Sequence, residues 1–174
     1  MPSPKELLLV DTNIISHALT PNQTEAYVKL FERLEKQYKF VVTGFTKYEI
    51  TCTSDKEHKA KIEEFIEQNM YYVGLSKALM DFAAKICYLY QKHPSTKSRK
   101  ITMGDIVNAA FAIGKPCNVL TIDNDDYPSP FFIELERQYV KYKAKKKDNK
   151  ITDVVRVLKP DPEHTKECFA THIV

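Results

Sequence analysis

Long apolar runs are missing from this 174-residue sequence. No stretch reaches the ~18 apolar residues that a membrane-spanning helix requires. The first residues, MPSPKELLLVD, contain only a four-residue apolar segment and no small-residue cleavage site, so they do not resemble a signal peptide. These absences predict a cytoplasmic protein that has no membrane partner.

Closely spaced cysteine pairs are also missing. The four cysteines lie tens of residues apart and none belongs to a C-x-x-C pair: Cys52, Cys87, Cys117 and Cys168. This spacing predicts reduced thiols that are buried or half-buried, and it argues against a disulfide framework, a redox pair or a zinc site.

A strong net charge is the third absence. The formal charge is only +3, so the type of partner has to be inferred from how charge is distributed along the chain. Hydrophobic residues make up 43% and charged residues 28% of the sequence, which is typical of a globular protein. The length is sufficient for a hydrophobic core and predicts a single domain over residues 1–174.

Short apolar runs alternate with amphipathic segments along the chain. Five strands are predicted, at residues 7–10, 40–43, 71–73, 118–122 and 154–158. Helices are predicted between them, which is typical of βαβ units. We therefore expect an α/β fold with a mostly parallel central sheet of four to five strands and helices on both faces. The segment 131–150 is predicted to be a helical insertion that becomes strongly basic toward its end.

Four acidic residues occupy related places next to the predicted strands. Asp11 follows the first strand, Glu49 lies on the helix after the second, Asp123 ends the fourth, and Asp105 begins the helix before it. In a doubly wound sheet, ligands bind outside the carboxyl ends of the strands. These four carboxylates should therefore share one pocket, and an all-oxygen pocket suits Mg²⁺, with Mn²⁺ as the alternative ion.

Each acid also has a purely structural interpretation. The pairs Thr46–Glu49 and Thr102–Asp105 fit the capping box of a helix N-terminus, and Asp11 fits an N-cap. The convergence of all four acids at one sheet edge favours the functional interpretation, because their mutual repulsion would be costly without a cation.

Four short motifs resemble those of the PIN-domain family. They are V-D-T-N-I-I at 10–15, F-T-K-Y-E-I at 45–50, G-D-I-V-N-A-A-F-A at 104–112 and V-L-T-I-D-N-D-D-Y at 119–127. The resemblance covers about residues 5–160. It implies a PIN-like three-layer sandwich and a metal-dependent ribonuclease that hydrolyses phosphodiester bonds.

The resemblance also implies roles for individual residues. Asp11 and Asp105 would be the principal magnesium ligands, and Glu49 and Asp123 would complete the catalytic acidic pocket. The polar residues that would hold these acids or a metal-bound water are Thr12, Asn13, Thr121 and Asp126.

Histidine is absent from all four motifs. The five histidines are His17, His58, His93, His164 and His172. We therefore expect no histidine base or nucleophile, and we expect His17, the one closest to a motif, to lie on a helix surface.

Basic residues before Asp105 are the predicted substrate contacts. Lys97, Arg99 and Lys100 lie in a polar loop that should be close to the metal site, where they could bind an RNA backbone in a salt-dependent way. The denser basic stretch within 137–150 either contacts substrate or is a solvated helix end. The preference for RNA over DNA comes only from the family resemblance.

The compact size resembles that of a VapC-type toxin of a type II toxin–antitoxin pair. Such toxins are neutralised by a small antitoxin protein and are usually dimeric, so a homodimer and an antitoxin partner are expected. Two alternatives remain: a housekeeping RNA-processing nuclease of the same fold, and a catalytically inactive PIN-like binding module.

Overall fold

The computed structural model describes residues 4–52, 55–143 and 149–172. Strands within these residues form one sheet of six, in the order β3 (Tyr71–Val73), β2 (Tyr38–Thr43), β1 (Glu6–Val10), β4 (Asn118–Thr121), β6 (Lys150–Pro160) and β5 (Phe132–Lys143). The helices are α1 (Thr12–Ala18), α2 (Thr24–Leu34), α3 (Gly44–Cys52), α4 (Lys56–Asn69), α5 (Lys77–Lys92), α6 (Met103–Gly114) and α7 (Pro162–His172).

The sheet is mixed, with three parallel and two antiparallel strand pairings. Strand β1 runs parallel to β2 and to β4, and β2 runs parallel to β3. Strand β6 runs antiparallel to both of its neighbours, β4 and β5. All five predicted strands are present, but the sheet is mixed and has six strands, so the predicted number of four to five was too low.

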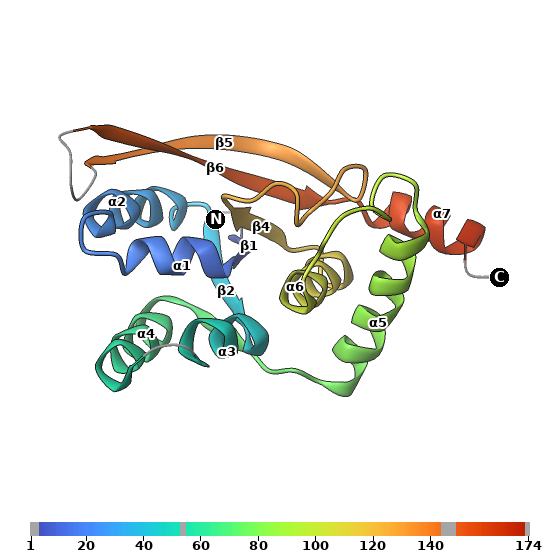
Figure 1. The fold of residues 1–174 in the computed structure, drawn as a ribbon, viewed down its shortest axis with the longest axis horizontal. Coiled ribbons are helices and arrows are strands. Elements are labelled where there is room, and N and C mark those ends of the chain that lie inside the picture. Colours follow the sequence, from blue (N-terminus) through green and yellow to red (C-terminus); the bar gives the residue numbers. More distant parts are fainter. Residues whose placement is uncertain (1–3, 53–54, 144–148, 173–174) are drawn as a thin grey trace.

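Helices cover both faces of the sheet, as predicted. Figure 1 shows α1 and α2 on one side of the central strands and α5 and α6 on the other. Successive residues of β1 belong to different cores: Leu8 and Val10 pack with α1, α2 and α4, while Leu9 packs with α5 and α6. This two-sided burial explains the uninterrupted apolar run of β1.

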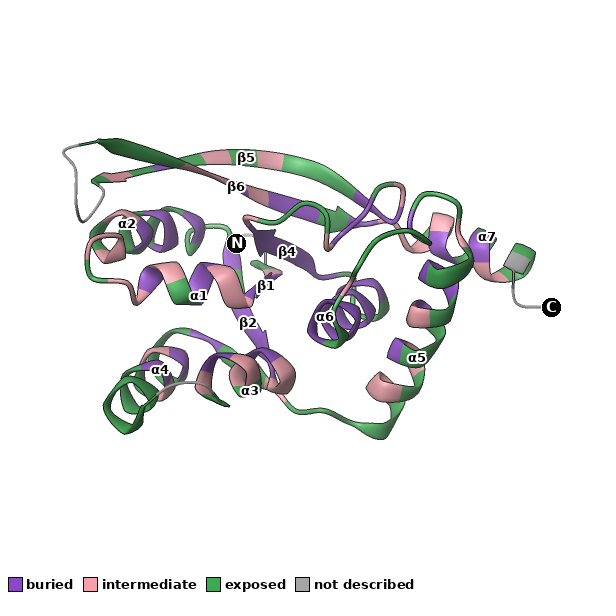
Figure 2. Ribbon diagram, in the orientation of Figure 1, coloured by how far each residue is buried: buried purple, intermediate pink, exposed green. Residues whose placement is uncertain are grey.

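Helix α6 is the most completely buried helix of the described residues. Ten of its twelve residues are buried, and Figure 2 shows it as a nearly continuous buried element beside β1 and β4. Alanines at 109, 110 and 112 are fully buried, which allows the helix to approach the sheet closely. Thr102 caps its N-terminus, so the position of this end is fixed.

The predicted helix at 131–150 is wrong. Residues Phe132–Lys143 form strand β5, which pairs along its length with β6 as a long antiparallel hairpin. From Leu135 onward, outward and inward side chains alternate, and the valine and tyrosines of this stretch favour strands. Pairing with β6 determines the structure of this stretch. Lys145, Lys146 and Lys147 of the predicted basic stretch lie outside the described residues.

A polar cluster attaches this hairpin to α1 and α2. Asp153 on β6 accepts hydrogen bonds from the hydroxyls of Tyr27 and Tyr142 at 2.8 and 3.1 Å, and it lies 2.9 Å from Nδ1 of His17. His17 lies on α1 with 31% of its side chain exposed, in keeping with the expected place on a helix surface, and its ring also contacts Asp153 and Tyr27. The far part of the hairpin is held against α2, as Figure 1 shows.

Within residues 4–52, 55–143 and 149–172, each helix is too short or too polar to cross a membrane.

Candidate active site

An open cleft lies where the parallel strands β1 and β4 end. The four predicted catalytic acids all line it: Asp11, Glu49, Asp105 and Asp123. The other lining residues are Thr12, Asn13, Thr102 and Asp126. The cleft has a volume of about 520 Å³, which is room for a hydrated divalent ion together with a phosphodiester group.

Asp11 is held by hydrogen bonds from two parts of the chain. It directly follows β1 and caps α1, with the backbone N–H of Thr12 donating to Oδ1 at 2.8 Å. Nδ2 of Asn13 and Oγ1 of Thr121 donate to Oδ2 at 2.9 and 2.7 Å. Asn13 and Thr121, which were expected to support the acids, therefore orient the carboxylate of Asp11. The Asp11 side chain is buried, with only 3% of the residue exposed.

Glu49 reaches the cleft from α3. This helix begins at Gly44, so Glu49 lies in its middle and is not the third residue of the capping box suggested with Thr46. Oγ1 of Thr12 donates to Oε2 of Glu49 at 2.8 Å. Thr12 therefore links the first and second acids of the cleft.

Asp105 occupies the first turn of α6 and is part of a capping box. Oγ1 and N of Thr102 donate to Oδ2 of Asp105 at 2.6 and 3.0 Å, and Oγ1 of Thr102 accepts from the backbone N–H of Asp105. The structural and functional interpretations of Asp105 are compatible, because the capped carboxylate also lines the cleft.

The loop after β4 contributes two further carboxylates. Asp123 is positioned by its own backbone N–H, which donates to Oγ1 of Thr121 at 3.0 Å. Its Oδ1 accepts from the N–H of Asp125 at 2.9 Å. Asp126, which the sequence suggested only as a supporting residue, lines the cleft itself, so five carboxylates share it.

Burial and neighbouring carboxylates raise the pKa values of four of the cleft acids. Burial first, and then the charges of Asp105 and Glu49, raise the pKa of Asp11 to about 6 against the hydrogen bonds that it accepts. Burial followed by repulsion from Asp105, Asp123, Asp11 and Asp125 raises the pKa of Asp126 to about 7. The pKa values of Glu49 and Asp105 are raised as well, with burial as the main cause. Such a group of carboxylates favours either protons or a cation.

A buried polar cluster behind the cleft was not found from the sequence. Oγ1 of Thr43 donates to Oδ1 of Asn108 at 2.7 Å, and Nδ2 of Asn108 donates to Oγ1 of Thr46 at 3.1 Å. Asn108 lies one turn after Asp105 on α6, and Thr46 lies one turn before Glu49 on α3. The cluster therefore fixes the two helices that carry these acids. Its signal in the sequence was Asn108, the one polar side chain besides Asp105 within α6.

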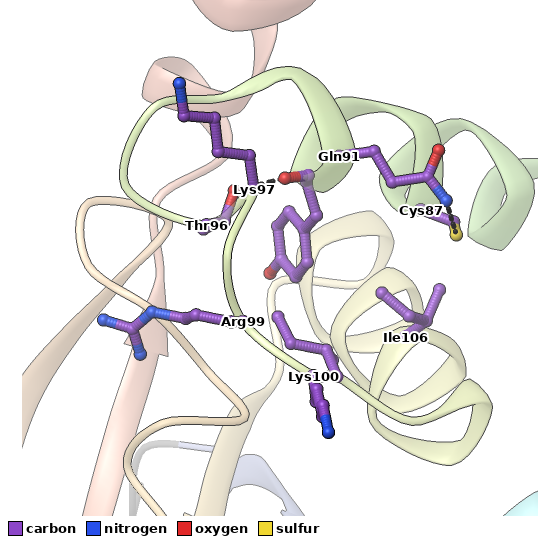
Figure 3. A pocket seen from close by; sticks show the side chains of 9 residues that line it. Cys87, Gln91, Thr96, Lys97, Arg99, Lys100 and Ile106 are labelled. Atoms are coloured by element: carbon purple, nitrogen blue, oxygen red, sulfur yellow. Dashed lines mark hydrogen bonds between the residues drawn. The ribbon is translucent and has the colours of Figure 1, made fainter.

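The predicted substrate-binding residues lie in the loop before α6, beside a small pocket. Figure 3 shows Lys97, Arg99 and Lys100 around this pocket, with their side chains pointing in different directions. Arg99 is engaged within the protein: its Nη1 donates to the backbone oxygen and to Oδ1 of Asp125 at 3.0 and 3.1 Å. Arg99 thus joins this loop to the loop that carries Asp123 and Asp126.

Comparison with known proteins gives a likeness in fold to solved structures. No protein-family model matches the chain, and no curated protein matches it significantly. Among solved structures, the fold is similar to a chain in the crystal structure of VapBC2 from Rickettsia felis bound to a DNA fragment from their promoter. The TM-score is 0.57 at 15% sequence identity, covering 70% of this chain and 90% of that chain. At this identity the likeness concerns the fold, and it supports a PIN-like α/β architecture.

Proposed function

We propose that this protein is a Mg²⁺-dependent ribonuclease that hydrolyses RNA phosphodiester bonds in the cleft at the ends of β1 and β4. The observation that carries the proposal is the gathering of five carboxylates from separate parts of the chain in one open cleft. A purely structural role would require each acid only to cap its own helix or turn, and would not require them to share a solvent-facing space.

The donor groups of the cleft fit a hard cation. They are carboxylates, hydroxyls and one side-chain amide, and oxygen ligands of this kind suit Mg²⁺ or Mn²⁺. The raised pKa values of Asp11 and Asp105 agree with this assignment, because a cation would relieve the repulsion that contributes to them. Asp11 and Asp105 would hold the ion, and Glu49 and Asp123 would complete the acidic pocket.

Bound Mg²⁺ supplies positive charge that polarises a phosphate oxygen and lowers the pKa of a water. Residues of the chain orient the carboxylates of the cleft. Asn13 and Thr121 fix Asp11, Thr102 fixes Asp105, and Thr12 fixes Glu49, so the carboxylates keep their positions as substrate enters. Preorganised groups of this kind need little rearrangement during the reaction.

The loop before α6 provides the contacts for the RNA backbone. Lys97 and Lys100 are exposed cations in the loop that leads into Thr102 of the acidic cleft, and cations there would offset the repulsion between the cleft and phosphate. Arg99 is kept in the proposal as a substrate contact. It also contacts Asp125, so it links this loop to the loop that carries Asp123 and Asp126.

A nuclease assay with single-carboxylate variants tests the proposed function. Asp105→Asn and Asp11→Asn should lower Mg²⁺-dependent cleavage of a structured RNA by at least ~10²-fold, because each removes charge that acts on the transition state. Asp81→Asn is the matched control: Asp81 is an exposed aspartate on α5, paired only with Lys77 in the same helix, and activity should not change. Equal cleavage in chelator and in Mg²⁺, or full activity of both cleft variants, would refute the proposal.

We further propose that the protein acts as the toxin of a toxin–antitoxin pair and forms a homodimer. The support is the fold likeness to VapBC2, whose structure contains a promoter DNA fragment. Expression of the protein alone should arrest growth, and co-expression of a small protein encoded beside its gene should restore it. Ordinary growth together with impaired RNA maturation in a deletion strain would favour the housekeeping nuclease, and inactivity in every RNA assay would favour the inactive binding module.

A further inference from the structure

Three potential metal ligands meet between the C-terminal end of α5 and α7, outside the acidic cleft. They are His93 at the C-terminal end of α5, and His164 and Cys168 on α7. One ligand atom from each residue lies within 4.8 Å of the other two. Nε2 of His164 and Sγ of Cys168 are 3.2 Å apart. None of the three takes part in the proposed nuclease reaction.

The ligands are held by regular structure. His164 and Cys168 are four residues apart on α7, so both side chains lie on the same face of the helix. The start of this helix is fixed by Asp161, whose Oδ1 accepts from the N–H of His164 at 2.9 Å. The rings of His93 and His164 both pack edge-on against Phe131, with centroids 5.0 and 5.4 Å away.

We propose that His93, His164 and Cys168 form a binding site for a transition-metal ion of the Zn²⁺ class. Two imidazoles and a thiolate are ligands that Zn²⁺ prefers, and three protein ligands with water in the fourth position make a known type of tetrahedral site. Zn–N and Zn–S bonds of about 2.0 and 2.3 Å place N and S about 3.5 Å apart at a tetrahedral angle. The 3.2 Å separation of the His164 and Cys168 donors requires only a small adjustment.

Two contacts of His93 and its neighbour support this assignment. Oγ of Ser95 lies 2.8 Å from Nδ1 of His93, and outer partners of this kind orient histidine ligands at metal sites. Oγ of Ser95 also donates to the backbone oxygen of Ser129 at 3.3 Å. On binding, the Cys168 thiol releases its proton to solvent and the ion takes the resulting thiolate.

The proposed site joins parts of the chain that are distant in sequence. It fastens α7 to the end of α5, next to the loop that continues through Lys97 and Arg99 to α6. The site therefore links these two elements, and it differs in chemistry from the acidic cleft: nitrogen and sulfur donors select softer metals than carboxylates do. The sequence argued against a zinc site because it has no C-x-x-C pair. The proposed site uses one cysteine and two histidines, and His93 is far from His164 and Cys168 in the sequence, so no local motif indicates it.

Cobalt substitution gives a test that does not depend on nuclease activity. The metal-free full-length protein is titrated with Co²⁺, and thiolate coordination should produce a near-ultraviolet charge-transfer band together with visible bands of a tetrahedral ion at one equivalent. Zn²⁺ should displace the cobalt and raise the melting temperature. Cys168→Ser should remove the charge-transfer band and weaken Co²⁺ binding by at least ~10²-fold, since loss of an outer partner alone costs 10–100-fold.

Matched variants separate this site from other thiols and from the acidic cleft. Cys87→Ser changes a half-buried cysteine of α5 outside the cluster, and Asp11→Asn changes the cleft; both should keep the cobalt spectrum. If Cys168→Ser does not fold, His164→Gln should weaken Co²⁺ binding while the thiolate band persists at high cobalt. Absence of the band in the wild type, or its persistence in folded Cys168→Ser, would overturn the proposal.

Discussion

The carboxylate of Glu49 occupies the space in which a side chain at position 104 would begin. A Cβ atom added to Gly104 would lie 2.5 Å from Oε1 and 2.8 Å from Cδ of Glu49. Gly104 directly precedes Asp105 on α6, so the absence of a side chain there lets α3 bring one acid close to the next. The geometry of the site requires glycine at this position. Helix α6 itself does not, because alanine has the higher helix propensity.

Gly104→Ala should impair the site without unfolding the protein. The added methyl group displaces the Glu49 carboxylate, and a misplacement of about 1 Å in a catalytic group can cost about 10²-fold in rate. We expect a loss of this order in kcat for RNA cleavage, measured at saturating RNA, with a melting temperature near that of the wild type.

Gly114→Ala is the control for this substitution. Gly114 ends the same helix, and a Cβ there meets only the ring of Phe82 at 3.5 Å, an ordinary van der Waals distance. Its activity should equal that of the wild type. Unchanged activity in Gly104→Ala would show that the position of Glu49 does not matter for cleavage.

The metal-free protein should lose stability as pH rises from about 4 to 7. Burial and neighbouring carboxylates raise the pKa of Asp11 from 3.8 to about 6 and that of Asp126 to about 7. In this window the folded state retains protons that the unfolded chain has released, so the free energy of unfolding falls with increasing pH. A change of 1 kcal/mol corresponds to roughly 2–4 °C at this chain length. We expect a decrease of several degrees in melting temperature, measured in chelator.

Two comparisons assign this pH dependence to the cleft. Asp126→Asn removes one of the two groups and should make the decrease smaller. Mg²⁺ at a pH above about 7 should recover stability in the wild type, because the ion replaces the missing protons. An identical decrease in wild type and Asp126→Asn would contradict the assignment.

Asp153→Asn should loosen the hairpin. The carboxylate is 13% exposed and contacts Tyr27, Tyr142 and His17, so the amide loses or weakens several hydrogen bonds. We expect a loss of about 1–3 kcal/mol in the free energy of unfolding, measured in urea. Amide hydrogen exchange should increase mainly in β5 and β6. A uniform increase over the whole sheet would mean that the contact supports global stability and not the hairpin.

Lys97→Gln and Lys100→Gln, combined in one variant, should weaken RNA binding. Each phosphate contact on single-stranded RNA contributes about 0.7 to the slope of log K against log salt, so loss of two contacts should reduce the slope by about 1.4. KM should rise while kcat changes little. Lys59→Gln changes an exposed lysine on α4 and should leave the slope unaltered. An unchanged slope in the double variant would remove this loop from the substrate path.

The sequence was most informative where local pattern and burial coincide. The apolar runs of β1, β2 and β4 predicted buried strands, and the acids that follow or flank them were placed correctly at one edge of the sheet. Strand β5 was mistaken for a helix because its structure depends on pairing with β6, which local composition does not reveal. The close approach of Glu49 to Gly104 and the grouping of His93 with His164 and Cys168 depend on tertiary packing and leave no local pattern in the sequence.

The burial of α6 couples the chemistry of the cleft to the interior of the protein. Asp105 lies on α6, and nearly all the other residues of this helix are buried in the core. A shift of Asp105 would therefore require repacking of both α5 and the sheet. Under the proposed function, changes in substrate preference are therefore expected in the exposed loop around Lys97 and not in the tightly packed alanines of α6.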